Sequence, residues 1–285
     1  KEERSEMLIR IADCLEKYKN DLIIAESKDN GKPESLAERV DLPRASTNLR
    51  FFASAILHDS SEMHDMDGTA INYTLRQPIG VAACISAWNL PLYLLTWKIA
   101  PAIAAGNTVV AKPSEITPMT AYLFSKICIE AGLPKGVLNI VHGEGQKVGD
   151  PLTTHPDVPI VSFTGGTVTG KHIAKVTAPM FKKLSLELGG KNPNIIFADA
   201  DFDKSVSFAS RAAFTNQGQI CLCGSRLFVE NKIYEKFKNA LVEKSKNLIV
   251  GDPKNPSSHL GAVVSKNHMN KILSKIDEAK DLGGK

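Results

Sequence analysis

The chain has 285 residues, of which 43% are hydrophobic, 6% aromatic and 23% charged. This composition is typical of a folded globular protein and excludes a disordered, collagen-like or coiled-coil chain. The formal net charge is +4, and because acidic residues are interleaved with basic ones, the charge indicates neither a nucleic-acid partner nor a membrane partner. The length predicts one large domain or two ordinary ones.

The cysteines predict a cytoplasmic protein, and the ends of the chain predict a fragment. Five scattered cysteines do not form a disulfide framework, and their odd number fits a reducing compartment. The apolar stretch 79–95 is too short and too interrupted to span a bilayer. The chain begins without Met, already in a helical pattern, and stops after Asp281-Leu-Gly-Gly-Lys285, which resembles a helix C-cap. We therefore expect an internal piece of a longer protein.

The first third of the chain predicts helices and then a hairpin. Apolar residues recur at three- and four-residue spacing from Met7 to Tyr18, a second helix covers 22–28 and ends at Gly31, and a third runs from about 36 to 57 with Pro43 opening or kinking it. The alternating segment 70–75, preceded by Asp67-Gly68, predicts a hairpin strand.

From residue 79 onward, strands and helices alternate. Strands are expected at 80–86, 107–112, 137–142 and 158–163, with helices at 92–105, from Thr117-Pro118 to Gly132, and from about 168. This order predicts an α/β fold with a mostly parallel sheet. After Gly190 a new unit begins, with strands at 194–197 and 226–230 and helices at 203–216 and 232–248.

A glycine-rich turn follows the predicted strand 158–163. Its sequence Phe163-Thr-Gly-Gly-Thr-Val-Thr-Gly-Lys171 opens a helix, so backbone N–H groups there can bind a phosphate. A P-loop would need Ser or Thr at position 172, where this chain has His. A dinucleotide site is the favoured interpretation, although the glycine spacing is not the usual one, and a simple structural turn is the alternative.

Lys112-Pro-Ser-Glu115 ends another predicted strand. Ligands bind at the carboxyl edge of a parallel sheet, so this Lys and Glu can reach ribose hydroxyls. The alternative is an exposed Lys–Glu turn.

Cys221 lies in Asn216-Gln-Gly-Gln-Ile-Cys-Leu-Cys-Gly-Ser-Arg226, at a polar junction between a helix and a strand. A thiol with a pKa near 8.5 becomes a nucleophile when a positive field lowers that pKa. The alternatives are a buried structural cysteine or, with Cys223, half of a metal site. The metal site is disfavoured because no second Cys or His pair has ligand spacing.

Two further residues fit parts of such chemistry. Glu187, in Leu-Glu-Leu-Gly-Gly, lies at an apolar strand end, where burial would raise its pKa toward that of a general base. A solvated strand residue is the alternative. Asn89, before Leu90-Pro91, can donate an amide N–H to a developing oxyanion or act as a helix N-cap.

These motifs together, in this order, resemble the aldehyde dehydrogenase superfamily over essentially the whole chain. The resemblance implies that Cys221 adds to the aldehyde carbon, that Asn89 and the Cys221 backbone N–H hold the oxyanion, and that Glu187 activates the water that hydrolyses the thioester. It also implies that NAD is the cofactor. Many members have Ser at the position of Gly166. The residues implied at the cofactor are Ser86, Trp88, Lys112, Ser114, Glu115, Thr164, Gly165, Gly166 and Leu188.

Lys112 and Glu115 would hold the adenosine ribose, and the Glu115 carboxylate would disfavour NADP. The implied architecture is a Rossmann-like NAD-binding domain, then the first part of an α/β catalytic domain, with a small oligomerisation hairpin. The corresponding residues are 1–57 and 79–187, then 188–285, and 58–78 for the hairpin. Relatives continue past residue 285, and the full-length protein is expected to form a dimer or tetramer.

The substrate implied by the resemblance is an aldehyde that carries a carboxylate. Arg44 aligns with a substrate-tunnel position that is usually apolar, and its guanidinium suits a carboxylate. With Tyr93 and Trp97 as further substrate residues, the chain is most similar to the family 8 branch, which acts on 2-aminomuconic semialdehyde. Arg44 as a surface helix residue is the alternative. A truncated, non-catalytic relative that serves as a binding or structural protein is the other function that the sequence allows.

Overall fold

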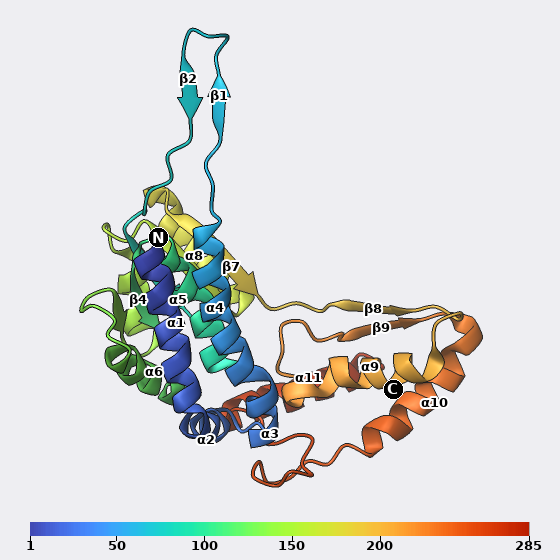
Figure 1. The fold of residues 1–285 in the computed structure, drawn as a ribbon. Helices are drawn as coiled ribbons and strands as arrows, with labels where there is room; N and C mark the ends of the chain where they lie inside the picture. The colour runs from blue at the N-terminus through green and yellow to red at the C-terminus, as the bar shows by residue number, and fades with distance from the viewer. Residues whose placement is uncertain (285) are drawn as a thin grey trace.

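The computed structural model describes residues 1–284, and Figure 1 shows its three parts: a body built on a central sheet, a hairpin that projects from one end, and a lobe to one side. Lys285 lies outside the described residues. No helix within residues 1–284 has the length and apolar content that crossing a bilayer requires.

The body is built on a five-stranded parallel sheet. Its strands stand in the order β5-β4-β3-β6-β7, so the direction of winding reverses between β3 and β6. The α/β fold with a parallel sheet is therefore confirmed. The order matches five of the six strands of a doubly wound dinucleotide-binding sheet. The strands are β3 (Val81–Ile85), β4 (Thr108–Lys112), β5 (Leu138–Ile140), β6 (Ile160–Gly165) and β7 (Lys183–Leu188).

Helices cover both faces of this sheet. Alternate residues of β3 show the division: Ala82 and Cys84 belong to the larger core, while Ala83 and Ile85 belong to the smaller one. Such burial on both faces is typical of parallel sheets. The helices of the body are α1 (Glu2–Lys17), α2 (Lys19–Asn30), α3 (Glu34–Leu36), α4 (Leu42–Leu57), α5 (Pro91–Ala104), α6 (Met119–Glu130), α7 (Asp150–Thr154) and α8 (Thr167–Thr177).

The predicted helices of the body are confirmed, with two differences. Pro43 lies in the first turn of α4, and a π-helical turn η1 (Ala37–Asp41) precedes it, so the expected third helix is divided. Proline is tolerated in a first turn because its missing N–H would have no helical partner there. The sequence pattern missed α7, because five residues are too few to establish a helical period.

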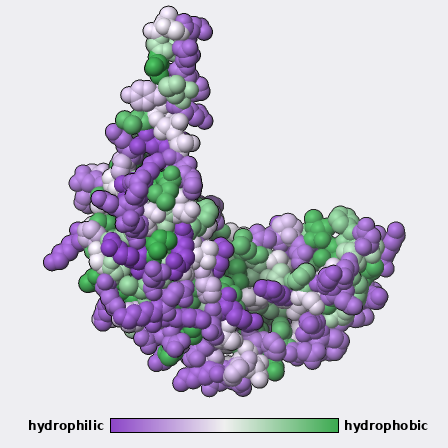
Figure 2. Space-filling model, viewed as in Figure 1, coloured by the Kyte–Doolittle hydropathy of each residue, from purple (hydrophilic) through white to green (hydrophobic). Residues whose placement is uncertain are grey.

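The hairpin of β1 (Met63–Asp65) and β2 (Ile71–Tyr73) is also confirmed. Asp67 and Gly68 both have positive φ, as a type I′ turn requires. In Figure 2 the hairpin stands clear of the body, and residues of both strands are exposed.

The lobe holds the second predicted unit. Its two parallel strands, β8 (Pro193–Ile196) and β9 (Arg226–Val229), pack on α9 (Phe202–Phe214) and α10 (Tyr234–Lys246) around a small core that includes Phe237. The loop after α10 leads back to the body, and the last helix, α11 (Lys266–Asp281), begins beside the body and runs toward the lobe, where the C-terminus lies (Figure 1).

Candidate active site

A cavity of about 1090 Å³ lies at the carboxyl end of the parallel sheet. It opens at the reversal between β3 and β6, which is where open α/β sheets bind ligands. Every residue predicted for catalysis or for cofactor binding contributes to its wall. These are Ser86, Trp88, Asn89, Lys112, Ser114, Glu115, Thr164, Gly165, Gly166, Glu187, Leu188 and Cys221.

The glycine-rich turn places a helix N-terminus at the cavity. Gly166 is the N-cap of α8, and no side chain caps this helix. Its first N–H groups therefore lack helical partners and lie where a phosphate would be favoured by the helix dipole. The structure thus supports an anion-binding interpretation of the turn.

Ser86 supplies a second polar group that has no partner in the protein. Its Oγ atom is buried in the cavity wall and forms no hydrogen bond with any group of residues 1–284. Because buried hydroxyls in native proteins are nearly always paired, this one is suited to a ligand.

Lys112 and Glu115 form an ion pair at the end of β4. Lys112 is buried, and its Nζ donates to Glu115 Oε2 at 3.1 Å and to the carbonyl of Pro113 at 3.1 Å. The Glu115 carboxylate is about half exposed, at the cavity. A buried lysine excludes the alternative of a freely exposed Lys–Glu turn, and the carboxylate keeps acceptor positions for ribose hydroxyls.

Asn89 lies between β3 and α5 and points toward the cysteine loop. Its Nδ2 donates to the carbonyl of Gln219 at 2.9 Å. An amide NH2 group has two hydrogens, so one remains for an oxygen in the cavity. Asn89 does not cap α5, whose N-cap is Leu90, so the alternative role as a helix cap is wrong.

The loop before Cys221 has an unusual backbone. Asn216, Gln217 and Gly218 all have positive φ, a conformation that costs roughly 1–2 kcal/mol for a residue with a side chain. Strain of this kind persists only where surrounding contacts fix it. Cys221 is partly buried, and its carbonyl accepts a hydrogen bond from Asn192 Nδ2 at 2.6 Å.

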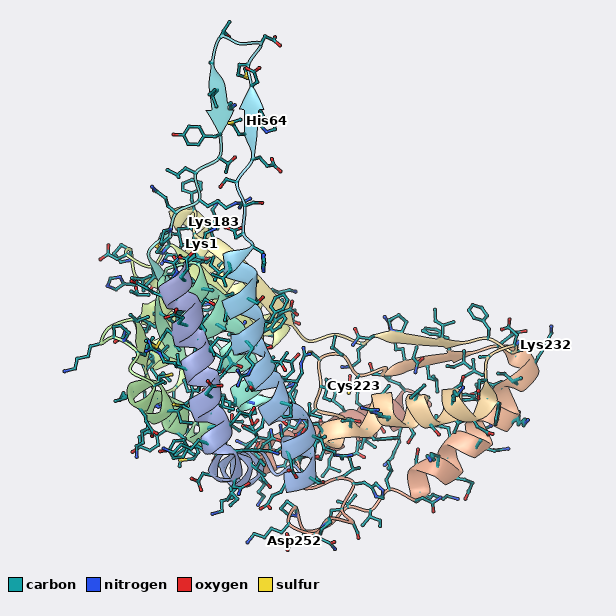
Figure 3. The ribbon with its side chains drawn as sticks, in the orientation of Figure 1. Lys1, His64, Lys183, Cys223, Lys232 and Asp252 are labelled. Atoms are coloured by element: carbon teal, nitrogen blue, oxygen red, sulfur yellow. The ribbon has the colours of Figure 1, made fainter. Side chains whose placement is uncertain are left out.

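Cys223 differs from Cys221 in its surroundings. It is buried, its Sγ contacts the carbonyl of Gly218 at 3.4 Å, and burial raises the pKa of its thiol. It lies at the inner end of the lobe, next to the body (Figure 3). A raised pKa disfavours the thiolate. Cys223 is therefore a structural cysteine, whereas Cys221 lies at the cavity.

Of the two interpretations of Glu187, the structure supports the solvated strand residue. Glu187 is exposed, because it lies near the end of β7, the edge strand of the sheet. Burial lowers the pKa of Lys98, a side chain of α5, to about 8, and the Glu187 carboxylate opposes this shift. Lys98 donates a hydrogen bond to Ser162 Oγ at 3.1 Å.

The three predicted substrate residues do not line the cavity. They gather instead where α4 packs on α5: Arg44 donates to the Tyr93 hydroxyl at 3.1 Å and lies over the Tyr93 ring. Trp97 packs edge-to-face on Phe52. Arg44 is exposed, and its guanidinium keeps donors for an acidic group.

Sequence reasoning missed several residues of the cavity wall, including four ionisable ones. His268 and Lys271 come from α11, and the His268 ring packs edge-to-face on Trp88. His172 of α8 lies 3.0 Å from the carboxylate of Asp150 on α7. His172 directly follows the glycine-rich turn, but no local spacing connects the other three residues to the motifs, so only the packing of α7 and α11 reveals them.

Comparisons with known proteins show the family of the chain. The sequence model of the aldehyde dehydrogenase family matches residues 1–285. The chain belongs to this family. It is 53% identical to the 2-aminomuconic semialdehyde dehydrogenase of Bos taurus over 280 residues, which is 98% of this chain and 58% of that protein.

Two further comparisons cover the same part of longer proteins. The 2-hydroxymuconic semialdehyde dehydrogenase of Pseudomonas sp. (strain CF600) is 44% identical over 286 residues, 99% of this chain and 59% of that protein. The NAD+ complex of an aldehyde dehydrogenase from Bacillus cereus superposes with a TM-score of 0.97 at 38% identity, covering 99% of this chain and 57% of that one. The chain thus spans somewhat more than half the length of the relatives it matches.

Proposed function

We propose that this chain forms the cofactor-binding and nucleophile-bearing part of an NAD-dependent dehydrogenase that oxidises an aldehyde to a carboxylic acid. The observation that supports this proposal best is a single cavity that contains Cys221, Asn89 and Glu187 together with the glycine-rich turn and the Lys112–Glu115 pair. Family membership over the whole chain supports it independently.

In this proposal the Cys221 thiolate adds to the aldehyde carbon and forms a thiohemiacetal. The oxygen that becomes negative accepts hydrogen bonds from Asn89 Nδ2 and from the backbone N–H of Cys221. When bound, NAD supplies the hydride acceptor that allows the thiohemiacetal to become a thioester. Glu187 then removes a proton from the water that attacks the thioester, and the acid product leaves Cys221 as a thiolate.

The cavity fits NAD at several points. The unpartnered Ser86 hydroxyl and the uncapped N-terminus of α8 offer donors to phosphate oxygens, and the half-exposed Glu115 carboxylate suits ribose hydroxyls. The same carboxylate would repel the 2′-phosphate of NADP. Trp88, Ser114, Thr164, Gly165, Gly166 and Leu188 complete the proposed cofactor wall.

We infer that the substrate is an acidic semialdehyde of the 2-aminomuconic type. The relatives named for muconic semialdehydes support this inference, as does the exposed Arg44, which is held by Tyr93 on the same face as Trp97. A charge-assisted hydrogen bond from Arg44 to the substrate carboxylate would contribute roughly 1.5–3 kcal/mol.

The proposal assigns roles to the parts of the fold. Residues 1–57 and 79–187 bind the cofactor, and residues 188–285 form the first part of the catalytic domain. The hairpin 58–78 is an oligomerisation arm, since its exposed strands project from the body (Figure 1).

The test is to follow NADH formation with succinic semialdehyde, using butanal as a neutral aldehyde of the same chain length. Cys221→Ala should lower turnover by at least about 10³-fold while NAD affinity, measured by calorimetry, is unchanged. Normal turnover by Cys221→Ala would contradict the proposed chemistry. Undiminished NAD binding with no NADH from the unsubstituted protein would instead favour a non-catalytic relative.

Arg44→Met tests the substrate class separately. It should lower kcat/KM for succinic semialdehyde by roughly 10- to 100-fold, because it removes a charge-assisted hydrogen bond. The kcat/KM for butanal should stay within about twofold. Equal losses with both aldehydes would show that Arg44 supports the fold and does not recognise a carboxylate.

A further inference from the structure

A buried ionic cluster lies beneath the proposed oxyanion site. Lys32 is fully buried, and its Nζ lies 2.8 Å from Asp41 Oδ1 and 3.5 Å from Glu26 Oε1, both of which are also fully buried. Removing such charges from water costs several kcal/mol per ion, and lysine is among the residues least often found wholly buried. Such a buried lysine needs hydrogen-bond acceptors for all three of its N–H groups.

The third partner of Lys32 is the backbone carbonyl of Asn89. This oxygen accepts hydrogen bonds from Lys32 Nζ at 3.2 Å, from Asn216 Nδ2 at 2.9 Å and, more weakly, from Asn30 Nδ2 at 3.3 Å. The donors come from two segments far apart in the chain, the turn 30–32 and the loop that carries Asn216. A carbonyl surrounded in this way cannot rotate without losing several hydrogen bonds at once, so the position of the Asn89 backbone is fixed.

Local backbone geometry directs Lys32 inward. Gly31 ends α2 in the left-handed conformation, with φ of 86°, and a Cβ atom there would lie 2.6 Å from the carbonyl oxygen of Ala262. The N–H of Glu34 donates to the carbonyl of Pro253 at 2.9 Å. The segment carrying Lys32 is therefore held against the loop before α11.

The charge state of the cluster leaves one carboxyl group neutral. Burial, together with the neighbouring Asp41, raises the pKa of Glu26 to about 8. At pH 7 Glu26 is therefore mainly protonated, and the Lys32–Asp41 pair is balanced without it. The ammonium can then donate to Asn89 without leaving an uncompensated charge in the interior.

We propose that Lys32 is a positioning residue for Asn89. By donating to the Asn89 backbone carbonyl while paired with Asp41, Lys32 holds the Asn89 side-chain amide beside the substrate oxygen that becomes negative when the Cys221 sulfur adds to the carbonyl carbon. This inference rests on the proposed function. Two hydrogen bonds link the same unit to the cysteine loop, because Asn89 donates to Gln219 and Asn216 donates to Asn89. Lys32 thus acts on the geometry of the reaction without touching the substrate.

The test compares two reactions of Cys221 in the double variant Lys32→Met/Asp41→Leu. Replacing both partners of a buried ion pair by apolar residues preserves folding far better than removing one. Attack of the thiolate on p-nitrophenyl acetate forms an S–C bond and an oxyanion, and then expels p-nitrophenolate. Attack on iodoacetamide forms an S–C bond and expels iodide without any oxyanion. The ratio of the two rates therefore reports the oxyanion site alone.

The control carries the same substitutions on an exposed ion pair nearby. Lys19 and Glu38 lie 3.0 Å apart and join α2 to η1. The buried cluster also connects these two elements, through Glu26 and Asp41. Lys19→Met/Glu38→Leu should leave both rates unchanged. In the buried double variant, acylation should fall by about 10- to 100-fold, since a displaced oxyanion donor loses most of its effect. Alkylation should stay within about twofold.

Each result has one interpretation. Acylation at the unsubstituted rate, or acylation and alkylation lowered equally, would overturn the role of Lys32 and leave the proposed function intact. If the unsubstituted protein were not acylated at Cys221 at all, the proposed function would fail and this inference with it. Should the buried double variant not fold, Lys32→Gln provides the second variant: it removes the ammonium donor to the Asn89 carbonyl but keeps an amide that can donate to Asp41. A rate ratio equal to that of the unsubstituted protein would overturn the inference.

Discussion

The body and the lobe differ in how many large apolar side chains each buries. The body surrounds a five-stranded sheet with helices on both faces, and its larger core contains fully buried side chains such as Leu8, Leu92 and Phe124. The lobe has two strands and a small core around Phe237. Several of its large apolar side chains are exposed, including Phe197, Phe208 and Phe228. Figure 2 shows apolar surface on the lobe.

This difference shows where the proposed active site obtains its rigidity. Cys221 belongs to the lobe side of the cavity, yet the strained turn before it is connected to the body through Asn89. Two parallel strands do not form a stable unit alone. The order of the cysteine loop therefore depends on hydrogen bonds to the body more than on the core of the lobe.

Removing a large side chain from the core of the body should have the largest effect. Phe124→Ala should lower the free energy of unfolding by about 3–5 kcal/mol, because Phe124 is fully buried in α6 and its loss leaves a cavity. The matched change Phe208→Ala, on the exposed face of α9, should stay within about 0.5 kcal/mol. Urea unfolding measures both, and similar values would contradict the comparison.

The same truncation in the lobe should act locally. Phe237 is buried in the small core of α9 and α10, and Phe237→Ala should cost about 3 kcal/mol. We expect faster amide hydrogen exchange in β8, β9, α9 and α10 with little change in β3 and β4, because sub-global opening follows regions with few buried contacts. Uniformly faster exchange over the whole chain would show that the two parts unfold as one.

The buried cluster of the body should produce a pH dependence that the lobe lacks. The pKa of Glu26 is about 8 in the folded protein and 4.5 as its ordinary value. Between these values the folded state binds more protons, so this group lowers stability as the pH rises from about 4.5 to about 8.

Glu26→Gln should remove this decline. The difference in unfolding free energy between variant and unsubstituted protein, measured at several pH values, should increase over that range. Replacing Glu243, which is exposed and pairs with Lys246 on α10, should leave the pH profile unchanged. If the difference in unfolding free energy did not change with pH, the pKa of Glu26 in the folded protein would be close to its ordinary value.

Gly166→Ser should have the smallest effect on stability. Nothing lies within 4 Å of a Cβ atom at this position, so the side chain fits. As the N-cap of α8, Ser should raise stability by a few tenths of a kcal/mol relative to Gly. Tighter NAD binding in calorimetry is expected because the hydroxyl adds a donor beside the proposed phosphate site. Weaker binding would mean that the cofactor backbone needs this space.

The fold followed from the sequence because its signals are local. Apolar periodicity defined α1, the Asp67-Gly68 turn defined the hairpin, and alternating strands and helices defined the parallel sheet. The catalytic and cofactor candidates were predicted from motifs that each end a strand or begin a helix. Since the carboxyl ends of parallel strands meet at one edge, their gathering in one cavity follows from the topology.

Local sequence patterns did not predict which side chains are buried or which distant residues they contact. The sequence allowed Glu187 to be buried or solvated, and the position of β7 at the sheet edge exposes it. Lys32 had no motif to mark it, and it is fully buried because a turn at Gly31 directs it inward. His268, far along the chain, reaches the cavity only because the loop before α11 brings the start of that helix to the body.

The order of residues alone therefore determined which segments become helices and strands and which motifs face the open edge of the sheet, because both depend on neighbours a few positions apart. Only the three-dimensional packing decided which charges are desolvated and which donors converge on Asn89. Those contacts join segments 57 to 127 positions apart. Free energies of burial and hydrogen bonding depend on such distant neighbours, which no local spacing specifies.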